Sequence, residues 1–139
     1  MRALGLDVGS KTIGIALTDE VGIAAHPLLV LERVGNSGDA VKIATLVAEH
    51  QVSDVVVGIP YELSGKIGHR ARRVRTFVDA LRAAIPGVTL HEQDERFTTA
   101  EAERVLLEAD LSRARRRDLI DQQAAALILQ TWLAARQKI

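Results

Sequence analysis

Four acidic residues are placed so that their side chains could form one carboxylate site. Asp7 ends the first expected strand, and Glu95 directly follows the last one. Asp121 lies in the first turns of the final expected helix, with Asp118 three residues before it. Ligands of open α/β sheets bind at the carboxyl ends of strands, so Asp7 and Glu95 are expected to converge. The small residues 124–126 would let the final helix approach the sheet and bring Asp121 into the same carboxylate cluster.

Such a cluster is typical of a divalent-metal site. Carboxylates packed together repel each other, and some stay protonated unless a cation lies among them. Hard oxygen ligands suit Mg²⁺ or Mn²⁺, and two such ions can activate a water and stabilise the leaving oxygen of a phosphodiester. We therefore expect Mg²⁺ or Mn²⁺ as the cofactor, with two ions in the site.

Each acid also has a simpler explanation. Asp7 could cap the turn that follows it, and Glu95 could form an ion pair with Arg96 or another arginine. Asp118 and Asp121 could instead compensate the dipole at the start of the final helix. These separate explanations do not account for the fact that all the acids fall where one site would form.

Two basic clusters flank the acidic segment of the sequence, although the formal net charge is zero. One runs from Lys66 to Arg82, and the other from Arg113 to Arg117. A charge run is usually a solvated face, but this arrangement suits a site that holds a polyanion beside metal-binding carboxylates. The residues expected to bind nucleic acid are Lys11, Ser64, Lys66, Arg70, Arg72, Arg73, Arg96, Arg116 and Arg117.

The composition fits a single domain that spans residues 1–139. A chain of this length can bury a core without disulfides. It contains no cysteine, which excludes disulfides, zinc–thiolate sites and a cysteine nucleophile. Asp7 comes too early for the apolar core of a signal peptide, and no apolar run approaches the ~20 residues of a membrane helix. We therefore expect a cytoplasmic protein without membrane contacts.

The apolar pattern predicts strands first, and then strands that alternate with helices. A hairpin is expected at 4–17, and Pro27 in the next extended run indicates an edge position or a bulge. The β-branched run 54–60 is typical of a central parallel strand buried on both faces. The other expected elements are a loop at 36–39, a helix from 41 to 50, a helix at 71–85, a strand at 88–93, and helices at 98–109 and 119–133. This order implies a layered α/β domain with parallel inner strands.

Four stretches of the chain match one known family in the right order. They are 4–14, 57–60 with 64–65, 94–102 and 120–130, and they include Leu-Gly-Leu-Asp-Val-Gly, Val-Gly-Ile-Pro, Asp-Glu-Arg-Phe-Thr-Thr and Ile-Asp-Gln-Gln-Ala-Ala-Ala. On these residues the chain resembles the YqgF/RuvX family of Holliday-junction resolvases, also described as pre-16S rRNA nucleases, within the ribonuclease H-like superfamily. The resemblance implies a three-layer α/β fold with helices on both faces of a five-stranded mixed sheet. The first three strands would be antiparallel and the rest parallel.

The same resemblance implies a divalent-metal-dependent endonuclease. Asp7, Glu95 and Asp121 would be its catalytic, metal-binding carboxylates, with Asp118 as a candidate fourth ligand. Cleavage would leave a 3′-hydroxyl and a 5′-phosphate. The substrate would be either Holliday-junction DNA, in recombination and repair, or the end of pre-16S rRNA, in ribosome biogenesis. Two symmetric nicks in a four-way junction favour a homodimer, whereas an RNA precursor needs no such symmetry.

The chain departs from the family pattern in two places. The family usually has an Asn in the loop after Gly-x-Pro, where this chain has Tyr61 and Glu62, and it more often has a Lys at the position of Asp118. Substrate contacts of that loop are therefore not carried over to this chain. We expect Glu62 to be a solvated loop acid rather than a further ligand.

The aromatic residues divide into two pairs. Phe77 and Trp132 occupy apolar helix positions and are expected in the core. Tyr61 and Phe97 lie beside the expected site, where either could stack on an unpaired base, although core packing is the simpler expectation for Phe97.

Two other functions remain open from the sequence alone. Actin-like ATPases and sugar kinases begin with a similar phosphate-binding hairpin, but they close two such domains on a nucleotide, and this chain has room for one. A non-catalytic RNA-binding module in ribosome assembly could keep the same fold, with the acids as relics. Nucleotide binding would favour the first alternative, and failure to bind Mn²⁺ would favour the second.

Overall fold

The computed structural model describes residues 2–95 and 113–137, with side chains described for 123–136 of the second range. The expected helix at 98–109 lies outside the described residues. The elements are β1 (Arg2–Val8), β2 (Thr12–Thr18), β3 (Ala25–Glu32), α1 (Asn36–Glu49), β4 (Val52–Ile59), α2 (His69–Ala84), β5 (Thr89–Asp94) and α4 (Arg113–Gln137). None of the described helices is both long enough and apolar enough to cross a membrane.

The strands form one mixed sheet in the order β3-β2-β1-β4-β5. β2 pairs antiparallel with both β1 and β3, whereas β4 pairs parallel with both β1 and β5. This arrangement confirms the expected five-stranded sheet. Because β1, β3, β4 and β5 all run in the same direction, their carboxyl ends meet at one edge of the sheet.

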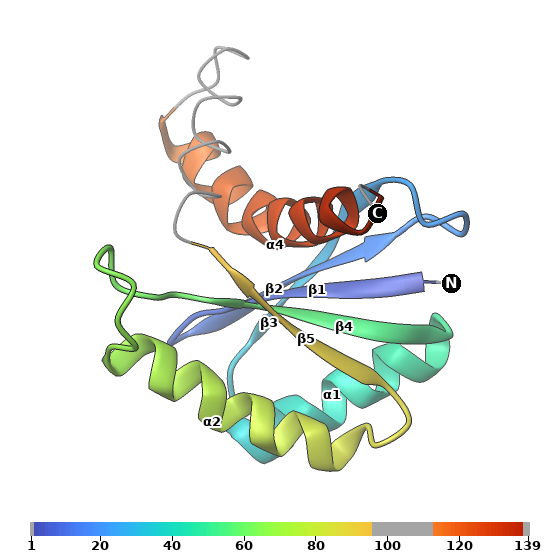
Figure 1. The fold of residues 1–139 in the computed structure, drawn as a ribbon, viewed down its shortest axis with the longest axis horizontal. Coiled ribbons are helices and arrows are strands. Elements are labelled where there is room, and N and C mark those ends of the chain that lie inside the picture. Colours follow the sequence, from blue (N-terminus) through green and yellow to red (C-terminus); the bar gives the residue numbers. More distant parts are fainter. Residues whose placement is uncertain (1, 96–112, 138–139) are drawn as a thin grey trace.

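Helices cover both faces of this sheet, as Figure 1 shows: α4 lies on one face, and α1 and α2 lie on the other. The three-layer prediction is therefore confirmed. The core between the sheet and α1 and α2 contains Leu6 and Phe77, and the core under α4 contains Val56, Leu129 and Trp132. The predicted apolar face of α2 and its end is buried throughout: Ala71, Val74, Phe77, Val78, Leu81 and Ile85.

The final helix packs unusually close to the sheet, as its run of small residues predicts. Ala124, Ala125 and Ala126 are all buried. A Cβ atom placed on Gly5 of β1 would lie only 2.8 Å from both the Ala125 carbonyl oxygen and Leu129 Cβ. The backbone of α4 therefore lies against the backbone of β1, with no side chain between them.

Pro27 lies on an edge strand, and the strand is irregular beside it, so both parts of that prediction are confirmed. Ile15 of β2 pairs with Leu29, but the next residue, Ala16, pairs with Pro27. Leu28 is thus an extra residue on β3, as in a β-bulge. The central strand β4 is buried from Val55 to Ile59, which confirms its predicted position between parallel neighbours.

The predicted loop at 36–39 is wrong, because these residues form the first turn of α1, which begins at Asn36. The buried apolar positions of α1 are Ala40 and Ile43, whereas Val41 is 63% exposed. The residue before the helix, Gly35, has a φ of 135°, a conformation that favours glycine and turns the chain into the helix.

Asp39 explains why the helix starts early. Its fully buried carboxylate accepts hydrogen bonds from the backbone N–H of Val34 (3.0 Å) and Gly35 (3.4 Å) and from Arg33 Nε (3.0 Å). Burial alone would raise the pKa of Asp39, but these donors outweigh it and lower that pKa below its ordinary value. The acid therefore binds the chain that enters the helix and keeps the first turn in place.

The final helix is also longer than predicted, since its backbone is helical from Arg113 rather than from about 119. The second basic cluster therefore lies within α4 and not before it. Asp118 and Asp121 lie more than one turn from the start of the helix, where the helix dipole has little effect. Dipole compensation is therefore excluded as the reason for these two acids.

The contact between β1 and α4 gives a direct test of the packing. Gly5→Ala should lower the free energy of unfolding by about 1–3 kcal/mol, because the added methyl group meets a backbone oxygen that cannot move aside. Urea denaturation would measure the change. Gly87→Ala is a suitable control, since a Cβ there would meet nothing within 4 Å. Equal stability of the two variants would contradict the close packing of α4.

Candidate active site

Asp7 and Glu95 are brought together at the edge where the parallel strands end. Asp7 is the next-to-last residue of β1, and Glu95 follows β5. The Glu95 backbone N–H donates to the Ile59 carbonyl (3.3 Å), which holds its main chain against the end of β4. The convergence expected for these two acids is therefore present in the structure.

Glu95 can reach Asp7 because the strand between them has no side chain at the crossing point. β4 separates β5 from β1, so the Glu95 side chain has to pass over it. It does so at Gly58, where an added Cβ would collide with Glu95 Oε2 and would lie 3.1 Å from Ile128 Cγ1. Gly58 thus gives space to both the Glu95 carboxyl group and α4.

The two carboxyl groups interact through their charges and a hydrogen bond between their side chains. Burial, the negative charge of Asp7 and a hydrogen bond between the two side chains together raise the pKa of Glu95 to about 7, against the opposing effect of the Arg70 guanidinium. The charge of Asp94 acts in the same direction as that of Asp7. Near neutral pH the pair therefore holds a proton on Glu95 unless another cation replaces it.

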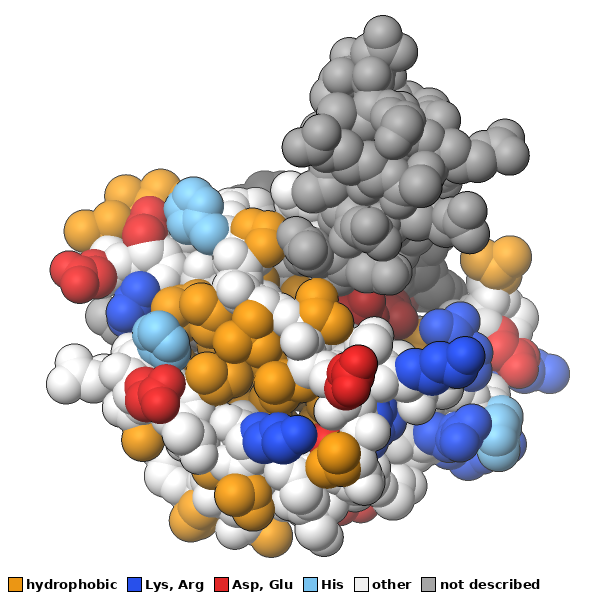
Figure 2. All heavy atoms as spheres, turned by 180° about the vertical axis from the view of Figure 1, so that it is seen from behind, with side chains coloured by type: hydrophobic (Ala, Val, Ile, Leu, Met, Phe, Trp, Pro, Cys, Tyr) orange, Lys and Arg blue, Asp and Glu red, His pale blue; other side chains and the backbone are white. Residues whose placement is uncertain are grey.

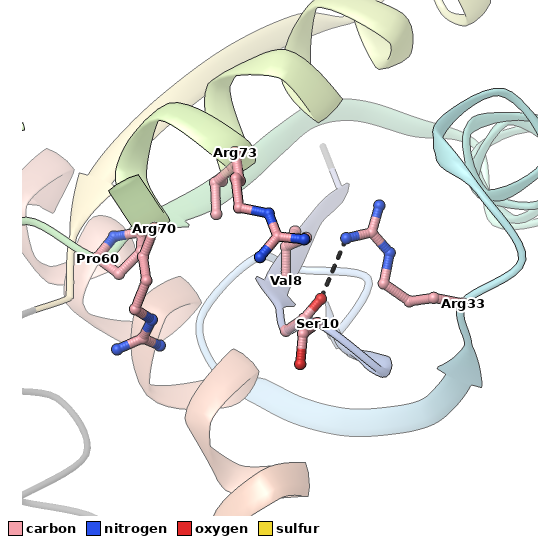
Figure 3. Close-up of a pocket in the computed structure, with 8 residues that line it drawn as sticks. Val8, Ser10, Arg33, Pro60, Arg70 and Arg73 are labelled. Atoms are coloured by element: carbon pink, nitrogen blue, oxygen red, sulfur yellow. Dashed lines mark hydrogen bonds between the residues drawn. The ribbon is translucent and has the colours of Figure 1, made fainter. Parts of the chain in front are cut away.

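A basic cavity of about 150 Å³ adjoins this pair. Figure 3 shows Arg33 and Arg73 reaching toward the turn at Val8 and Ser10. In this view Arg73 lies between Arg33 and Arg70. The turn belongs to the same hairpin as Asp7, and the arginines come from α2 and from the segment after β3. The residues that line the cavity are Val8, Gly9, Ser10, Arg33, Pro60, Arg70, Arg73 and Val74.

Arg33 is a site residue that the sequence analysis missed. Its guanidinium donates to the Gly9 carbonyl (3.1 Å) and to Asn36 Oδ1 (2.6 Å), in addition to Asp39. The signal that could have identified it is topological. β3 runs in the same direction as β1, so an arginine just past its end comes to the same edge as Asp7.

The other expected nucleic-acid contacts lie around this edge and are exposed. Lys11 is in the β1–β2 turn, Ser64 and Lys66 are in the loop between β4 and α2, and Arg72 donates to the Ile67 carbonyl (3.4 Å). Figure 2, which looks onto the β3 side of the molecule, shows Lys and Arg side chains gathered at the end where α2 begins. The structure thus places a basic rim beside the carboxylate pair.

Several expected site residues cannot be placed at the level of side chains. Arg96 lies outside the described residues. Arg116, Arg117, Asp118 and Asp121 belong to the backbone of α4, in the part whose side chains are not described. Among the described residues, no group of three or more metal-type ligands is present, so Asp7 and Glu95 stand as a pair there.

Tyr61 supports the loop before α2. Its hydroxyl accepts a hydrogen bond from Arg75 (3.2 Å), which also pairs with Glu92 (3.0 Å), and its half-buried ring packs against the core. Glu62 is exposed, as expected, and its carboxylate lies against Gly68 at the start of α2. Phe97, for which core packing is the simpler expectation and base stacking the alternative, lies outside the described ranges.

Comparison with known proteins identifies the family of the chain. A family profile described as "RuvX: Holliday junction resolvase" matches residues 1–135. A protein of Myxococcus xanthus named "Putative pre-16S rRNA nuclease" is 47% identical over 137 residues, which cover 99% of this chain and 90% of that protein. A protein of Desulforudis audaxviator with the same name is 47% identical over 139 residues, with 99% and 96% covered.

Solved structures with a similar fold include two resolvases. Thermus thermophilus RuvC in complex with a Holliday junction substrate aligns with a TM-score of 0.63 at 18% identity, covering 99% of this chain and 96% of that one. The Fowlpox virus resolvase with Holliday junction DNA aligns with a TM-score of 0.53 at 9% identity, again covering 99% and 96%. At these identities the likeness is one of fold, the ribonuclease H-like fold expected from the sequence. The profile match over nearly the whole length and the curated relatives show that the chain belongs to the RuvX family of Holliday junction resolvases, a family of nucleases.

Proposed function

We propose that this protein is a divalent-metal-dependent endonuclease that hydrolyses phosphodiester bonds in structured nucleic acid. The observation that carries the proposal is the pair of carboxyl groups, Asp7 and Glu95, held in hydrogen-bonding contact at the carboxyl edge of the sheet beside a basic cavity. Asp7 and Glu95 would bind Mg²⁺ or Mn²⁺ together with Asp121.

The chemistry of the pair fits a hard divalent cation. Two carboxyl groups in a partly buried site cannot both ionise cheaply, and the pKa of about 7 for Glu95 expresses this cost. A cation with oxygen ligands would replace the shared proton and remove the repulsion. When bound, such a cation supplies a lowered pKa for the attacking water and charge stabilisation for the leaving oxygen.

The course of α4 supports Asp121 as a third ligand. Ile128 lies over Gly58, the same position that the Glu95 side chain crosses. Asp121 precedes Ile128 by two helical turns, and this spacing assigns both residues to one face of the helix. The start of α4 lies toward the sheet edge at which β5 ends (Figure 1). Asp118, one turn earlier, remains a candidate fourth ligand.

The residues around the pair would orient the substrate. Arg70 is close enough to Glu95 to lower its pKa, so its guanidinium can also neutralise a phosphate bound at the carboxylates. Lys11, Lys66 and Arg72 on the exposed rim would contact backbone phosphates further along, which positions a nucleic acid without reading its sequence. Arg96, Arg116 and Arg117 are proposed to extend this rim.

Two substrates fit the proposal, and the comparisons favour each in a different way. The family description names the Holliday junction, whereas the curated relatives at 47% identity are named for pre-16S rRNA. Paired nicks in a four-way junction need two active sites and therefore a homodimer, while trimming of an RNA end needs one site. Both substrates occur in the bacterial cytoplasm, where we expect the protein to act.

Asp7→Asn tests the catalytic assignment, because it keeps the shape of the side chain and removes the charge that would bind the cation. The loss of several kcal/mol of transition-state stabilisation should lower the cleavage rate by roughly a thousandfold or more. The assay offers a labelled four-way DNA junction and a labelled pre-16S rRNA to both proteins with Mn²⁺ or Mg²⁺. Asp79→Asn, an acid on α2 whose side chain is 77% exposed, should cleave like wild type.

The products of that assay separate the substrates. Paired nicks in the junction would assign the protein to recombination or repair, and trimming of the RNA end alone would assign it to ribosome maturation. Activity retained by a folded Asp7→Asn protein would overturn the assignment of Asp7. Absence of cleavage by the wild type on both substrates would favour the non-catalytic RNA-binding module.

Glu95→Gln tests the raised pKa of Glu95 through the pH dependence of stability. In the metal-free protein the folded state keeps a proton on Glu95 up to about pH 7, whereas the unfolded chain releases it near the ordinary value of 4.5. The wild type therefore loses stability as the pH rises between these values, by up to about 3 kcal/mol. Glu95→Gln should lack this loss, so its advantage over wild type should grow from pH 4.5 to pH 8.

Urea denaturation at several pH values would measure this effect, with Glu20→Gln as an exposed control. Mn²⁺ should raise the melting temperature of the wild type at pH 8 and leave that of Glu95→Gln nearly unchanged. Parallel pH curves for the wild type and Glu95→Gln would show that folding does not raise the pKa of Glu95.

A further inference from the structure

The basic cavity beside the carboxylate pair has one fixed wall. Arg33 is held by Asp39, Asn36 and the Gly9 carbonyl, and its guanidinium lies 5.3 Å from the centre of the Phe77 ring. Asp39, which anchors it, is completely buried. These contacts use three of the five N–H donors of the guanidinium, and they fix the plane in which the others lie. The position of Arg33 is therefore set before any ligand binds.

The opposite wall carries the positive charges of Arg70 and Arg73, and the charge of Arg70 also acts on Glu95. Arg70 and Arg73 are exposed, and neither makes a hydrogen bond or an ion pair with a residue in the described ranges. They are three residues apart on α2, a spacing at which like charges repel each other. Two exposed guanidinium groups that line one cavity favour an anion from outside the protein, and their planar donors suit phosphate.

The cavity and the carboxylate pair share parts of the same structure. Asp7 is followed directly by Val8, Gly9 and Ser10, which line the cavity. Arg70 lines the cavity and also acts electrostatically on Glu95. Two residues of extended chain span about 7 Å, so a phosphate in the cavity would lie close to one at the carboxylates without occupying the same place.

We propose that this cavity holds a second, uncleaved backbone phosphate of the substrate strand, adjacent to the phosphate that is cleaved at Asp7 and Glu95. The inference rests on the proposed nuclease function and adds a defined subsite to it. Arg33, Arg70 and Arg73 grip the second phosphate and thereby set which bond of the strand lies over the carboxylates. The subsite positions the strand and is independent of base sequence.

The test measures binding by a protein that cannot cleave, so its result does not depend on whether the proposed activity is found. Asp7→Asn is titrated with a labelled four-way junction and a labelled RNA precursor in which one phosphate at a time is replaced by an uncharged methylphosphonate. At one position near the bound bond, the replacement should weaken binding roughly tenfold. Arg73→Gln, added to Asp7→Asn, should weaken binding of the unmodified strand by a similar factor and abolish the effect of the replacement at that position only.

Arg82→Gln, added to Asp7→Asn in the same way, is the matched control. Arg82 lies on the same helix, carries the same charge, is 63% exposed and pairs with Asp79 instead of lining the cavity. Its loss should leave the profile of the methylphosphonate scan unchanged. The slope of log affinity against log salt concentration should fall by about one for Arg73→Gln and by less for Arg82→Gln.

Two outcomes would overturn the inference. In the first, Arg73→Gln and Arg82→Gln weaken binding equally, and the effects of the mutation and of the methylphosphonate replacement add at every position. This result would show a diffuse basic surface. A flat scan, combined with inorganic phosphate raising the melting temperature of the wild type but not of Arg73→Gln, would show a site for a free anion. Arg73 is exposed, so loss of folding is not expected to obscure either result.

Discussion

The absence of side chains at Gly5 and Gly58 is the constraint on which the rest of this structure depends. At Gly5 it allows the backbone of α4 to lie against β1, and at Gly58 it allows the Glu95 carboxyl group to cross β4. A methyl group at either position would push apart the layers that form the site. The carboxylate pair is thus a product of backbone packing as much as of the acids themselves, because two glycines and a run of alanines determine how near α4 and Glu95 can come.

Charge is placed around the site in two different ways. In the ion pair of Arg33 with Asp39, the Asp39 side chain is fully buried and the Arg33 side chain mostly buried, and both make further hydrogen bonds. This pair fixes the start of α1 and one wall of the cavity. The carboxyl groups of Asp7 and Glu95 are instead placed where they repel each other. A protein that only needed stability would gain from the first arrangement and avoid the second, which is why the second indicates function.

Much of the fold could be predicted from the sequence because its signals are local and periodic. Each local pattern indicates how its residues are buried: the β-branched run of β4, the apolar face of α2 and the alanines of α4. The convergence of Asp7 and Glu95 followed from the rule that parallel strands share one carboxyl edge.

The start of α1 could not be predicted in this way, since Asp39 caps the helix through hydrogen bonds with the chain before it and with Arg33. Arg33 itself carries no motif, and only the direction of β3 shows that it belongs to the site. The start of α4 was missed because the arginines at 113–117 were interpreted as a charge cluster, although arginine and alanine both favour helices. The role of Asp121 remains a prediction.

The irregular edge strand β3 has a consequence for how copies of this protein can meet. Its side of the molecule exposes hydrophobic side chains, among them Val30 and Val34, and an unprotected strand there would offer a template for sheet extension between molecules (Figure 2). Pro27 removes one backbone donor from that strand, and the extra residue Leu28 breaks its repeat. Continuous pairing of one sheet with another is therefore blocked along this edge. Association through this face would therefore rely on packing of side chains rather than on continuous pairing of strands.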